Sequence, residues 1–129
     1  MKSLNVVITG SSRGFGKSLA KEFLRKGHNV IIHSGNNQNL MNSYVELYEY
    51  KKSNNQSLYK VCADIKNESE CNMLVKQSID YLDNIDIWIN NAAISNRDSF
   101  KDHTISEIIN IYTTNLIGTV MLCNLLVQN

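Results

Sequence analysis

Residues 9–16, with the sequence TGSSRGFG, have the types and spacing that suit phosphate binding. They follow an apolar run and precede a stretch of helical period, which predicts a turn between a strand and a helix. Gly10 permits a tight turn, Gly14 lets the backbone approach a pyrophosphate, and Gly16 permits close packing of the helix. The start of that helix adds free amide groups and about half a positive charge. A glycine-rich turn without a ligand is the alternative. The predicted contacts are Gly10, Ser11, Ser12, Arg13, Gly14, Phe15 and Gly16.

The remaining segments predict the framework around this turn. Short apolar runs alternate with longer stretches of helical period. Because a strand, a crossover helix and a parallel strand are right-handed in nearly all known proteins, such repeated units build an open parallel sheet with helices on both faces. We therefore expect an α/β fold, a Rossmann-like doubly wound parallel sheet truncated after about four strands, in one domain over residues 1–129. The expected strands are 4–9, 29–33, 58–63 and 85–89, and the expected helices are 14–26, 40–52, 67–82 and 105–127, the last with a break near Asn115.

The composition argues against several classes of function. The chain has 129 residues, with 13 Lys and Arg against 12 Asp and Glu, and a formal charge of +1. This balance lacks the basic excess expected of a protein that binds nucleic acid or an anionic membrane. The first apolar run, of about six residues, is shorter than that of a signal peptide or a membrane span. We therefore expect a cytoplasmic protein.

The three cysteines predict neither a disulfide framework nor a metal site. Cys62, Cys71 and Cys123 are odd in number and widely spaced, without a CxxC pair or paired histidines. We expect three reduced and mostly buried thiols.

The TGxxxGxG spacing resembles the glycine motif of the short-chain dehydrogenase/reductase family, which has three residues between its first two glycines. Further motifs of the family recur in order. Asp64, with Ile65 beside it, follows the third expected strand and matches the acidic residue that contacts the adenine ring. Asn115 in TTNLIG matches the family's helix-junction asparagine.

Residues 90–93, with the sequence NNAA, end the fourth expected strand and resemble the family's NNAG motif. This likeness implies that Asn91 and Ala92 contact the cofactor. Ala93 stands where the family has glycine, and its methyl group is expected to crowd the backbone near the nicotinamide ribose. Taken singly, each of these polar residues fits a cap, a turn or a helix break equally well, so it is their order that supports the resemblance.

The resemblance implies an oxidoreductase that transfers hydride between a nicotinamide dinucleotide and a carbonyl or alcohol. The end of the second strand indicates which dinucleotide. An NAD site places Asp or Glu there to accept from the ribose 2′-hydroxyl, whereas this chain has Ser34. Ser34 can donate to a 2′-phosphate and Arg13 can pair with it, which favours NADP(H) over NAD(H). Gly35 lies where similar NADP-preferring proteins often have a second basic residue.

The family's catalytic Ser and YxxxK segment follows the next strand, and these 129 residues do not contain it. Only Asn115 of the catalytic group is present, with the implied role of holding a water in the proton relay. A literal YxxxK at residues 48–52 lies in a helix expected far from the nicotinamide, so a catalytic role is not expected there. We therefore expect weak or no turnover by this chain alone, and an unpaired sheet edge at the fourth strand that favours poor solubility or pairing with another chain.

Three functions remain open from the sequence. The first is an NADP-dependent oxidoreductase, which either acts with a separate second-half partner or is represented here by only part of its chain. The second is a non-catalytic nucleotide-binding module, and the third is an inactive remnant. The expected partners are the nicotinamide dinucleotide, a small carbonyl or alcohol substrate, and a second copy or a second-half polypeptide. A methyltransferase would place an acidic residue where Ser34 stands, and a nucleotide-sugar epimerase has two residues between its first glycines, so both fit less well.

Overall fold

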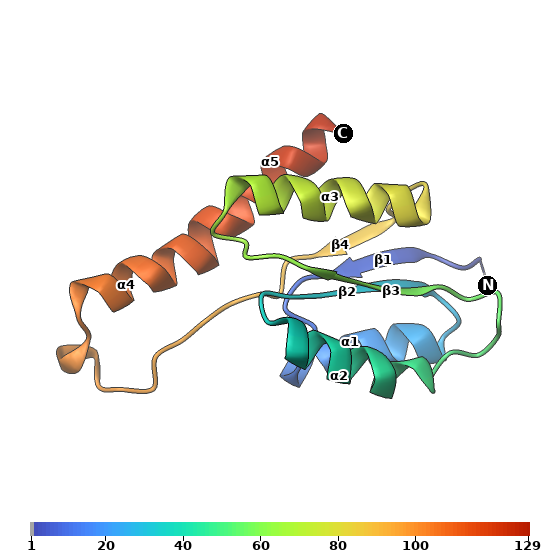
Figure 1. Cartoon of the computed structure of the whole chain (residues 1–129), viewed down its shortest axis with the longest axis horizontal. Coiled ribbons are helices and arrows are strands. Elements are labelled where there is room, and N and C mark those ends of the chain that lie inside the picture. Colours follow the sequence, from blue (N-terminus) through green and yellow to red (C-terminus); the bar gives the residue numbers. More distant parts are fainter. Residues whose placement is uncertain (1) are drawn as a thin grey trace.

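The computed structural model describes residues 2–129, except for the side chain of Phe100. Four parallel strands form one sheet in the order β3-β2-β1-β4 (Figure 1). Helices cover both faces of the sheet, which confirms the predicted Rossmann-like α/β class. The strands are β1 (Asn5–Ile8), β2 (Asn29–Ser34), β3 (Leu58–Cys62) and β4 (Ile87–Ile89).

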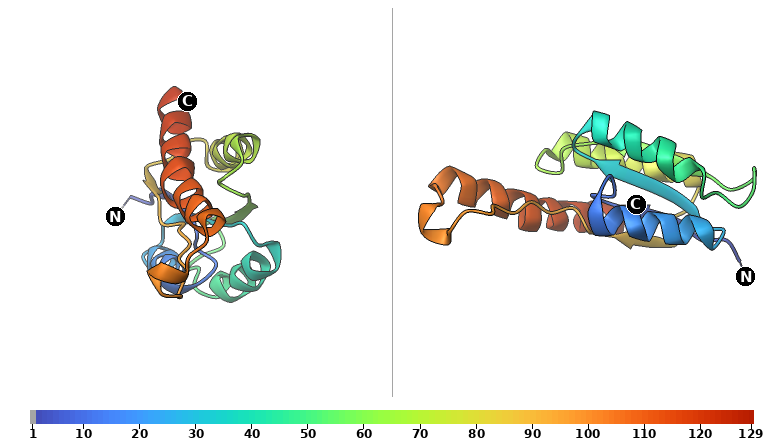
Figure 2. Two further views of the ribbon diagram at one scale, coloured as in Figure 1. Left: turned by 90° about the vertical axis from the view of Figure 1, so that its left-hand side faces the viewer. Right: turned by 90° about the horizontal axis from the view of Figure 1, so that it is seen from below.

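The helices form two layers. Helices α1 (Gly14–Arg25) and α2 (Asn37–Tyr48) lie on one face of the sheet, whereas α3 (Glu68–Leu82) and α5 (Thr119–Gln128) lie on the other (Figure 1). Helix α4 (Ile105–Tyr112) and the segment before it extend beyond the carboxyl ends of the strands (Figure 2). The end of α4 therefore lies beside the carboxyl ends of the strands, where open parallel sheets bind their ligands.

Strand β1 is buried on both faces, because successive side chains of a strand point to opposite sides. Val6 and Ile8 pack in the cluster that includes Leu24 of α1 and Leu47 of α2. Val7, between them, packs in the other cluster with residues of α3 and α5. All three β1 side chains are fully buried. Consecutive β1 residues are therefore all apolar, whereas a strand exposed on one face would alternate apolar and polar residues.

Helix α2 begins and ends earlier than the predicted residues 40–52. Its N-cap is Asn36, whose side chain accepts a hydrogen bond of 2.9 Å from the backbone amide of Asn39. The first turn is rich in asparagine and glutamine and has no apolar period, so hydrophobic spacing did not reveal it. At the other end, the side chain of Gln56 accepts from the Lys52 amide at 2.7 Å and holds the chain in a turn.

Residues 105–128 form one continuous helical stretch, with the π-helical turn Thr113–Gly118 between α4 and α5. The break predicted near Asn115 is therefore a widened turn inside the helix, of a kind often found at functional sites. A capping box starts the stretch, since Thr104 accepts from the Glu107 amide and the Glu107 carboxylate accepts from the Thr104 amide.

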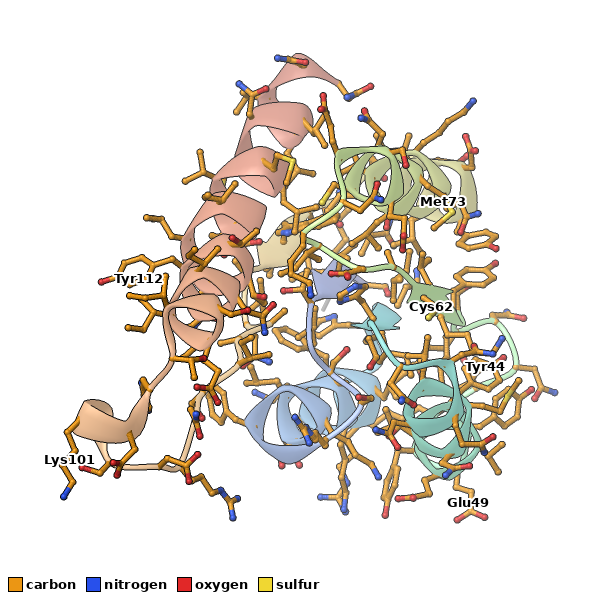
Figure 3. All side chains as sticks on the ribbon, turned by 60° about the vertical axis from the view of Figure 1, so that its left-hand side comes forward. Tyr44, Glu49, Cys62, Met73, Lys101 and Tyr112 are labelled. Carbon is orange, nitrogen blue, oxygen red and sulfur yellow. The ribbon has the colours of Figure 1, made fainter. Side chains whose placement is uncertain are left out.

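The stretch Ile105–Gln128 is long and apolar enough to cross a membrane by length and composition alone, with a mean hydropathy of 1.3 in its most apolar window. A core helix of a soluble protein passes the same test. One side is a core face, because Leu122 is fully buried in the cluster with α3. The opposite side is exposed, as the outward-pointing Tyr112 shows in Figure 3. We call this exposed side the α4–α5 stripe, which comprises Ile105, Ile109, Tyr112, Leu116 and Val120.

Candidate nucleotide-binding cleft

A cleft of about 630 Å³ opens at the carboxyl ends of the strands, a volume in the usual range for ligand pockets. Every site residue predicted from the sequence lines it, except Ser11 and Asn115. The lining residues are Gly10, Ser12, Arg13, Gly14, Phe15, Gly16, His33, Ser34, Gly35, Asn36, Asn39, Ala63, Asp64, Ile65, Lys66, Asn91, Ala92, Ala93, Ile94, Asn110 and Thr114.

Each glycine of the turn after β1 meets a different constraint. Gly10 has a φ of +63°, and a Cβ atom there would lie 2.6 Å from the Cα of Ala92. A Cβ at Gly16 would collide with the side-chain amide of Asn91 and lie 2.6 Å from the carbonyl oxygen of Gly10. Gly14 has a φ of +55° with open space around it, so its backbone is accessible from the cleft. Only glycine satisfies all three positions without strain.

The N-terminus of α1 faces the cleft without a protein cap. Arg13 is its N-cap residue, with an extended backbone and no side-chain hydrogen bond to the first turn. The first-turn amides and the helix dipole are therefore available to an anion. The Arg13 side chain is exposed, and among the described residues no ion pair holds its guanidinium group.

The segment after β4 forms the floor of the cleft and is bonded to the glycine turn. The Thr9 hydroxyl accepts from the backbone amides of Asn91 and Ala92, each at 3.0 Å. The Asn91 side-chain amide donates to the carbonyl oxygens of Thr9 and Gly10, again at 3.0 Å. Asn90 points elsewhere, since its side-chain oxygen accepts from the indole of Trp88 at 3.0 Å. The two asparagines of the NNAA motif thus have different roles.

The end of β2 is polar and uncharged. Ser34 is 8% exposed, and its hydroxyl oxygen accepts from the Ser12 hydroxyl and from the Asn36 amide, both at 3.1 Å. The Ser12 carbonyl accepts from Ser43 of α2, so the glycine turn, β2 and α2 are linked on this side. The Ser34 hydroxyl keeps its own proton available for a ligand, because its oxygen is the acceptor in both of these bonds.

A second polar corner lies after β3. The Asp64 carboxylate accepts from the Lys66 amide at 3.0 Å, and its other oxygen lies 3.6 Å from the Lys66 ammonium group. Lys66 also donates to the Asn110 side chain of α4 at 3.1 Å and so spans this end of the cleft. Thr114 lies here as well, and its buried hydroxyl has no hydrogen-bond partner among the described residues.

Ser11, which is also a predicted cofactor contact, is not among the residues that line the cleft. Its side chain is fully buried, and its hydroxyl donates to the Ile8 carbonyl at 2.6 Å and accepts from the His33 amide at 2.9 Å. These bonds fix the glycine turn to the ends of β1 and β2. The sequence does not distinguish Ser11 from Ser12, because adjacent serines in a turn look equally exposed.

His33 lines the cleft and was not identified from the sequence. It is 2% exposed, and burial lowers the pKa of its imidazole below the ordinary value. The only signal in the sequence is a polar residue at the end of the apolar strand NVIIHS. Five further residues line the cleft that the sequence did not indicate: Asn36 and Asn39 at the start of α2, Lys66 in the loop after β3, Asn110 in α4 and Thr114 in the π-helical turn.

Asn115 lies in the π-helical turn, outside the cleft lining. Its side chain accepts from the amide of Ile94 and donates to the Ile94 carbonyl, both at 2.8 Å. The asparagine amide is therefore engaged with the chain that follows β4. Its backbone carbonyl accepts from the Thr119 hydroxyl at 3.1 Å. The side chain keeps one oxygen lone pair and one amide hydrogen beyond its bonds to Ile94.

The cysteines differ in exposure. Cys71 is buried, and burial together with the nearby Asp64 carboxylate raises the pKa of its thiol to about 11. Cys62 is half-buried, and burial raises the pKa of its thiol as well. Cys123 is exposed, contrary to the expectation of mostly buried thiols, because the end of α5 has a free outer side. Within residues 2–129, no group of three His, Cys, Asp or Glu side chains is placed to hold a metal ion.

The geometry defines a class of protein. A bare glycine turn, an uncapped helix N-terminus and a polar corner with a carboxylate lie along one cleft at the end of a parallel sheet, as in proteins that bind a dinucleotide. The family model for short chain dehydrogenase matches residues 4–129. The chain belongs to the short-chain dehydrogenase/reductase family.

Relatives of known name support this assignment. The chain is 37% identical to the chloroplastic chlorophyll(ide) b reductase NOL of Oryza sativa subsp. japonica, an alignment that covers 92% of this chain and 35% of that protein. It is 30% identical to the ketoacyl reductase HetN of Nostoc sp., with 96% of this chain and 42% of that protein covered. The chain thus spans less than half the length of these relatives.

Solved structures show the same fold. A short chain dehydrogenase from Mycobacterium smegmatis superposes with a TM-score of 0.88 at 19% identity, covering 98% of this chain and 52% of that one. A putative short-chain alcohol dehydrogenase from Sinorhizobium meliloti 1021 gives a TM-score of 0.83 at 21% identity, covering 97% of this chain and 48% of that one.

Proposed function

We propose that this chain is the NADP(H)-binding part of an oxidoreductase that transfers hydride between the nicotinamide and a carbonyl or alcohol. The observation that supports it most is the cleft, where the open backbone of Gly14 and the free amides of α1 would receive the pyrophosphate. The Asp64 carboxylate at the other corner would accept from the adenine amino group. Family membership supplies the reaction class.

The preference for NADP(H) rests on charge at the end of β2. A carboxylate at Ser34 would repel a 2′-phosphate, which carries nearly two negative charges, whereas the hydroxyl can donate to it. Arg13 lies on the same cleft with an exposed, unpaired guanidinium group within the described structure. Because guanidinium pairs well with phosphate, Arg13 is the residue we expect to select NADP(H). Gly35 adds room beside it and no second cation.

The described residues would provide the cofactor side of the reaction. No tyrosine is among the lining residues of the cleft as described. Tyr48 is 53% exposed at the end of α2, where the Lys51 ammonium group lies 4.6 Å from its ring centre. Tyr48 belongs to α2 and does not line the cleft, so it is not placed to donate a proton to a substrate beside the nicotinamide. We therefore propose that the 129-residue chain alone binds cofactor without turnover; a non-catalytic module or an inactive remnant are the alternative functions.

The α4–α5 stripe supports a protein partner. Five apolar side chains on one side of a helix, each more than half exposed, form a face of the kind that packs against another polypeptide. A second copy or a second-half polypeptide would fit this face. The cytoplasmic location stays a prediction, and the plant relatives are described as chloroplastic.

The first test is a titration of the purified chain with NADPH and with NADH, followed by Trp88 quenching and nicotinamide emission. We expect tighter binding of NADPH. Because the Arg13 side chain is exposed, its contribution should lie at the low end for a charged hydrogen bond, so Arg13→Ala should weaken NADPH binding about 10-fold and leave NADH nearly unchanged. Arg25→Ala, a cation at the other end of α1 beside Glu22, is the matched control and should change neither affinity.

Three outcomes would contradict different parts of the proposal. Equal loss of both nucleotides in Arg13→Ala would remove Arg13 from the 2′-phosphate and reject the NADP preference. A folded chain that binds neither nucleotide would reject the cofactor proposal and leave family membership alone. A positioned general acid contributes roughly 10²- to 10⁴-fold to the reaction rate, and we expect none in this chain. Measurable carbonyl-dependent oxidation of NADPH by the chain alone would therefore contradict the proposed lack of turnover.

A further inference from the structure

The imidazole of His33 joins two strand ends beneath the cleft. Its Nδ1 atom lies 3.1 Å from the backbone amide nitrogen of Gly10, and its Nε2 atom lies 2.9 Å from the carbonyl oxygen of Ala63. Gly10 belongs to the glycine turn after β1, and Ala63 follows β3. The ring is 2% exposed, so water does not replace these partners. Both nitrogens are therefore committed to backbone groups.

The two backbone partners determine the protonation state of the ring. An amide N–H only donates, so Nδ1 must be an acceptor; a carbonyl oxygen only accepts, so Nε2 must carry the proton. His33 is therefore a neutral imidazole with its hydrogen on Nε2. An imidazolium ion would direct an Nδ1 proton at the Gly10 N–H, and the glycine turn would lose its bond to β2 at this point.

The charged groups around the cleft act in opposite directions. Asp64 follows Ala63 and favours the charged ring, as does the carbonyl of Ala63 itself. Arg13 and Lys66 line the same cleft and disfavour it, as does the positive end of α1. Helix α2 contributes only uncharged side chains to the lining. Burial outweighs the favourable contacts and lowers the pKa of the ring.

We propose that neutral His33 is a positioning residue for the glycine turn, and that its protonation weakens nucleotide binding as the pH falls below neutral. The inference rests on the proposed cofactor site, since the turn that His33 holds is the one that would receive the pyrophosphate. The ring acts on the site through its hydrogen bond with the Gly10 amide. A shift of the turn would carry Gly14 with it and misplace the amides of α1.

His28 provides a matched control. It is also buried, and its Nδ1 also accepts a backbone amide, that of Leu4 at 3.2 Å. It lies after α1, at the opposite end of the sheet from the cleft, and is not among its lining residues. A second buried histidine whose Nδ1 accepts from a backbone amide thus tests whether any effect is specific to the glycine turn.

Two substitutions separate the two hydrogen bonds of His33. His33→Asn keeps an oxygen near the Nδ1 position and loses the group that reaches Ala63. His33→Gln places its amide near the Nε2 position and leaves the Gly10 amide without a close acceptor. We expect His33→Asn to bind NADPH close to wild type, and His33→Gln to bind about 5- to 10-fold more weakly, the effect of one buried amide left unpaired. His28→Asn should match wild type.

The pH profile provides the decisive readout. NADPH affinity is measured between about pH 4.5 and 7.5, because burial lowers the pKa of His33 below the ordinary histidine value near 6.5. Titration of the 2′-phosphate near pH 6 is common to all variants, so the ratio of wild-type to His33→Asn affinity isolates the ring. We expect that ratio to fall several-fold toward acid pH. A constant ratio, or equal affinities of His33→Asn and His33→Gln, would overturn the proposal.

Nitrogen NMR tests the geometry without a ligand. In ¹⁵N-histidine-labelled protein, His33 should show an unprotonated Nδ1 and titrate at lower pH than an ordinary histidine. The Gly10 amide should exchange with solvent faster in His33→Gln than in wild type. A proton on Nδ1 at neutral pH, or unchanged exchange, contradicts the role of His33. Failure of wild type to bind NADPH with these NMR results intact would instead reject the proposed function and the effect on binding with it.

Discussion

Substituting Gly16 with alanine should destabilise the fold by an amount set by crowding. The added Cβ would collide with the Asn91 side-chain amide, and it would also lie 2.6 Å from the Gly10 carbonyl oxygen and 3.0 Å from the Cα of Ser11. Two of these neighbours are backbone, which cannot turn away. Overpacking of this kind costs about 1–3 kcal/mol.

The collision also breaks hydrogen bonds. Asn91 donates to the carbonyls of Thr9 and Gly10, and displacement of its amide would remove both bonds, at about 1 kcal/mol each. Alanine is a better helix former than glycine, which returns about 1 kcal/mol. The net expectation is a loss of about 2–4 kcal/mol in the free energy of unfolding, measured by urea denaturation with circular dichroism.

Gly35→Ala is the matched control, because Gly35 lines the same cleft and its added Cβ would have only ordinary contact, 3.6 Å from the Ala63 carbonyl. It should change the free energy of unfolding by less than about 1 kcal/mol. Adding Asn91→Ala to Gly16→Ala should recover part of the loss, a coupling of about 1 kcal/mol or more. If Gly16→Ala were as stable as Gly35→Ala, the turn would have room that the structure does not show, and the reasoning would fail.

Two further expectations concern α5 and the thiols. Leu122→Ala should lower the free energy of unfolding, measured in urea, by about 2–5 kcal/mol, because Leu122 is fully buried against α3. Val127 is 85% exposed, so Val127→Ala should have little effect. Similar losses in both variants would contradict the packing of α5. At about pH 8, a thiol reagent should label Cys123 fast and Cys71 slowly, because a pKa of about 11 leaves roughly one thousandth of the latter as thiolate. Cys123→Ser should abolish the fast phase, and a fast phase that survives this change would refute the assignment.

The order of strands and helices was predictable because each element has a local cause. The β1 run is apolar without alternation, which is typical of a strand covered on both faces. The helical spacing of apolar residues predicts a helix at 67–82, and the structure makes Asn67 the N-cap of α3. The glycines were identified because their spacing reflects backbone constraints that only glycine meets. Helix α2 was misplaced at both ends, since Asn36 and its neighbours mark no face of a helix.

The parts of the cleft that were missed depend on contacts between distant residues. In the sequence, His33 looks like any polar residue at the end of a strand. Its role depends on hydrogen bonds with the amide of Gly10 and the carbonyl of Ala63, which only the fold brings close to the ring. Thr114 and Asn110 reach the cleft because α4 and the π-helical turn pass over it. The sequence identifies Asn115 by its place in TTNLIG, but its two bonds to Ile94 follow from the fold alone.

The bonds between Thr9 and Asn91 also impose an order on events during synthesis. The glycine turn and α1 emerge first, but the floor of the cleft closes only across a separation of 82 residues. Contacts between residues so far apart form late, because the intervening chain must first be closed into a loop. A nascent chain can therefore display the whole glycine motif without a usable cleft. Nucleotide in the cell would select the chains in which β4 has docked and would shift the folding equilibrium toward them.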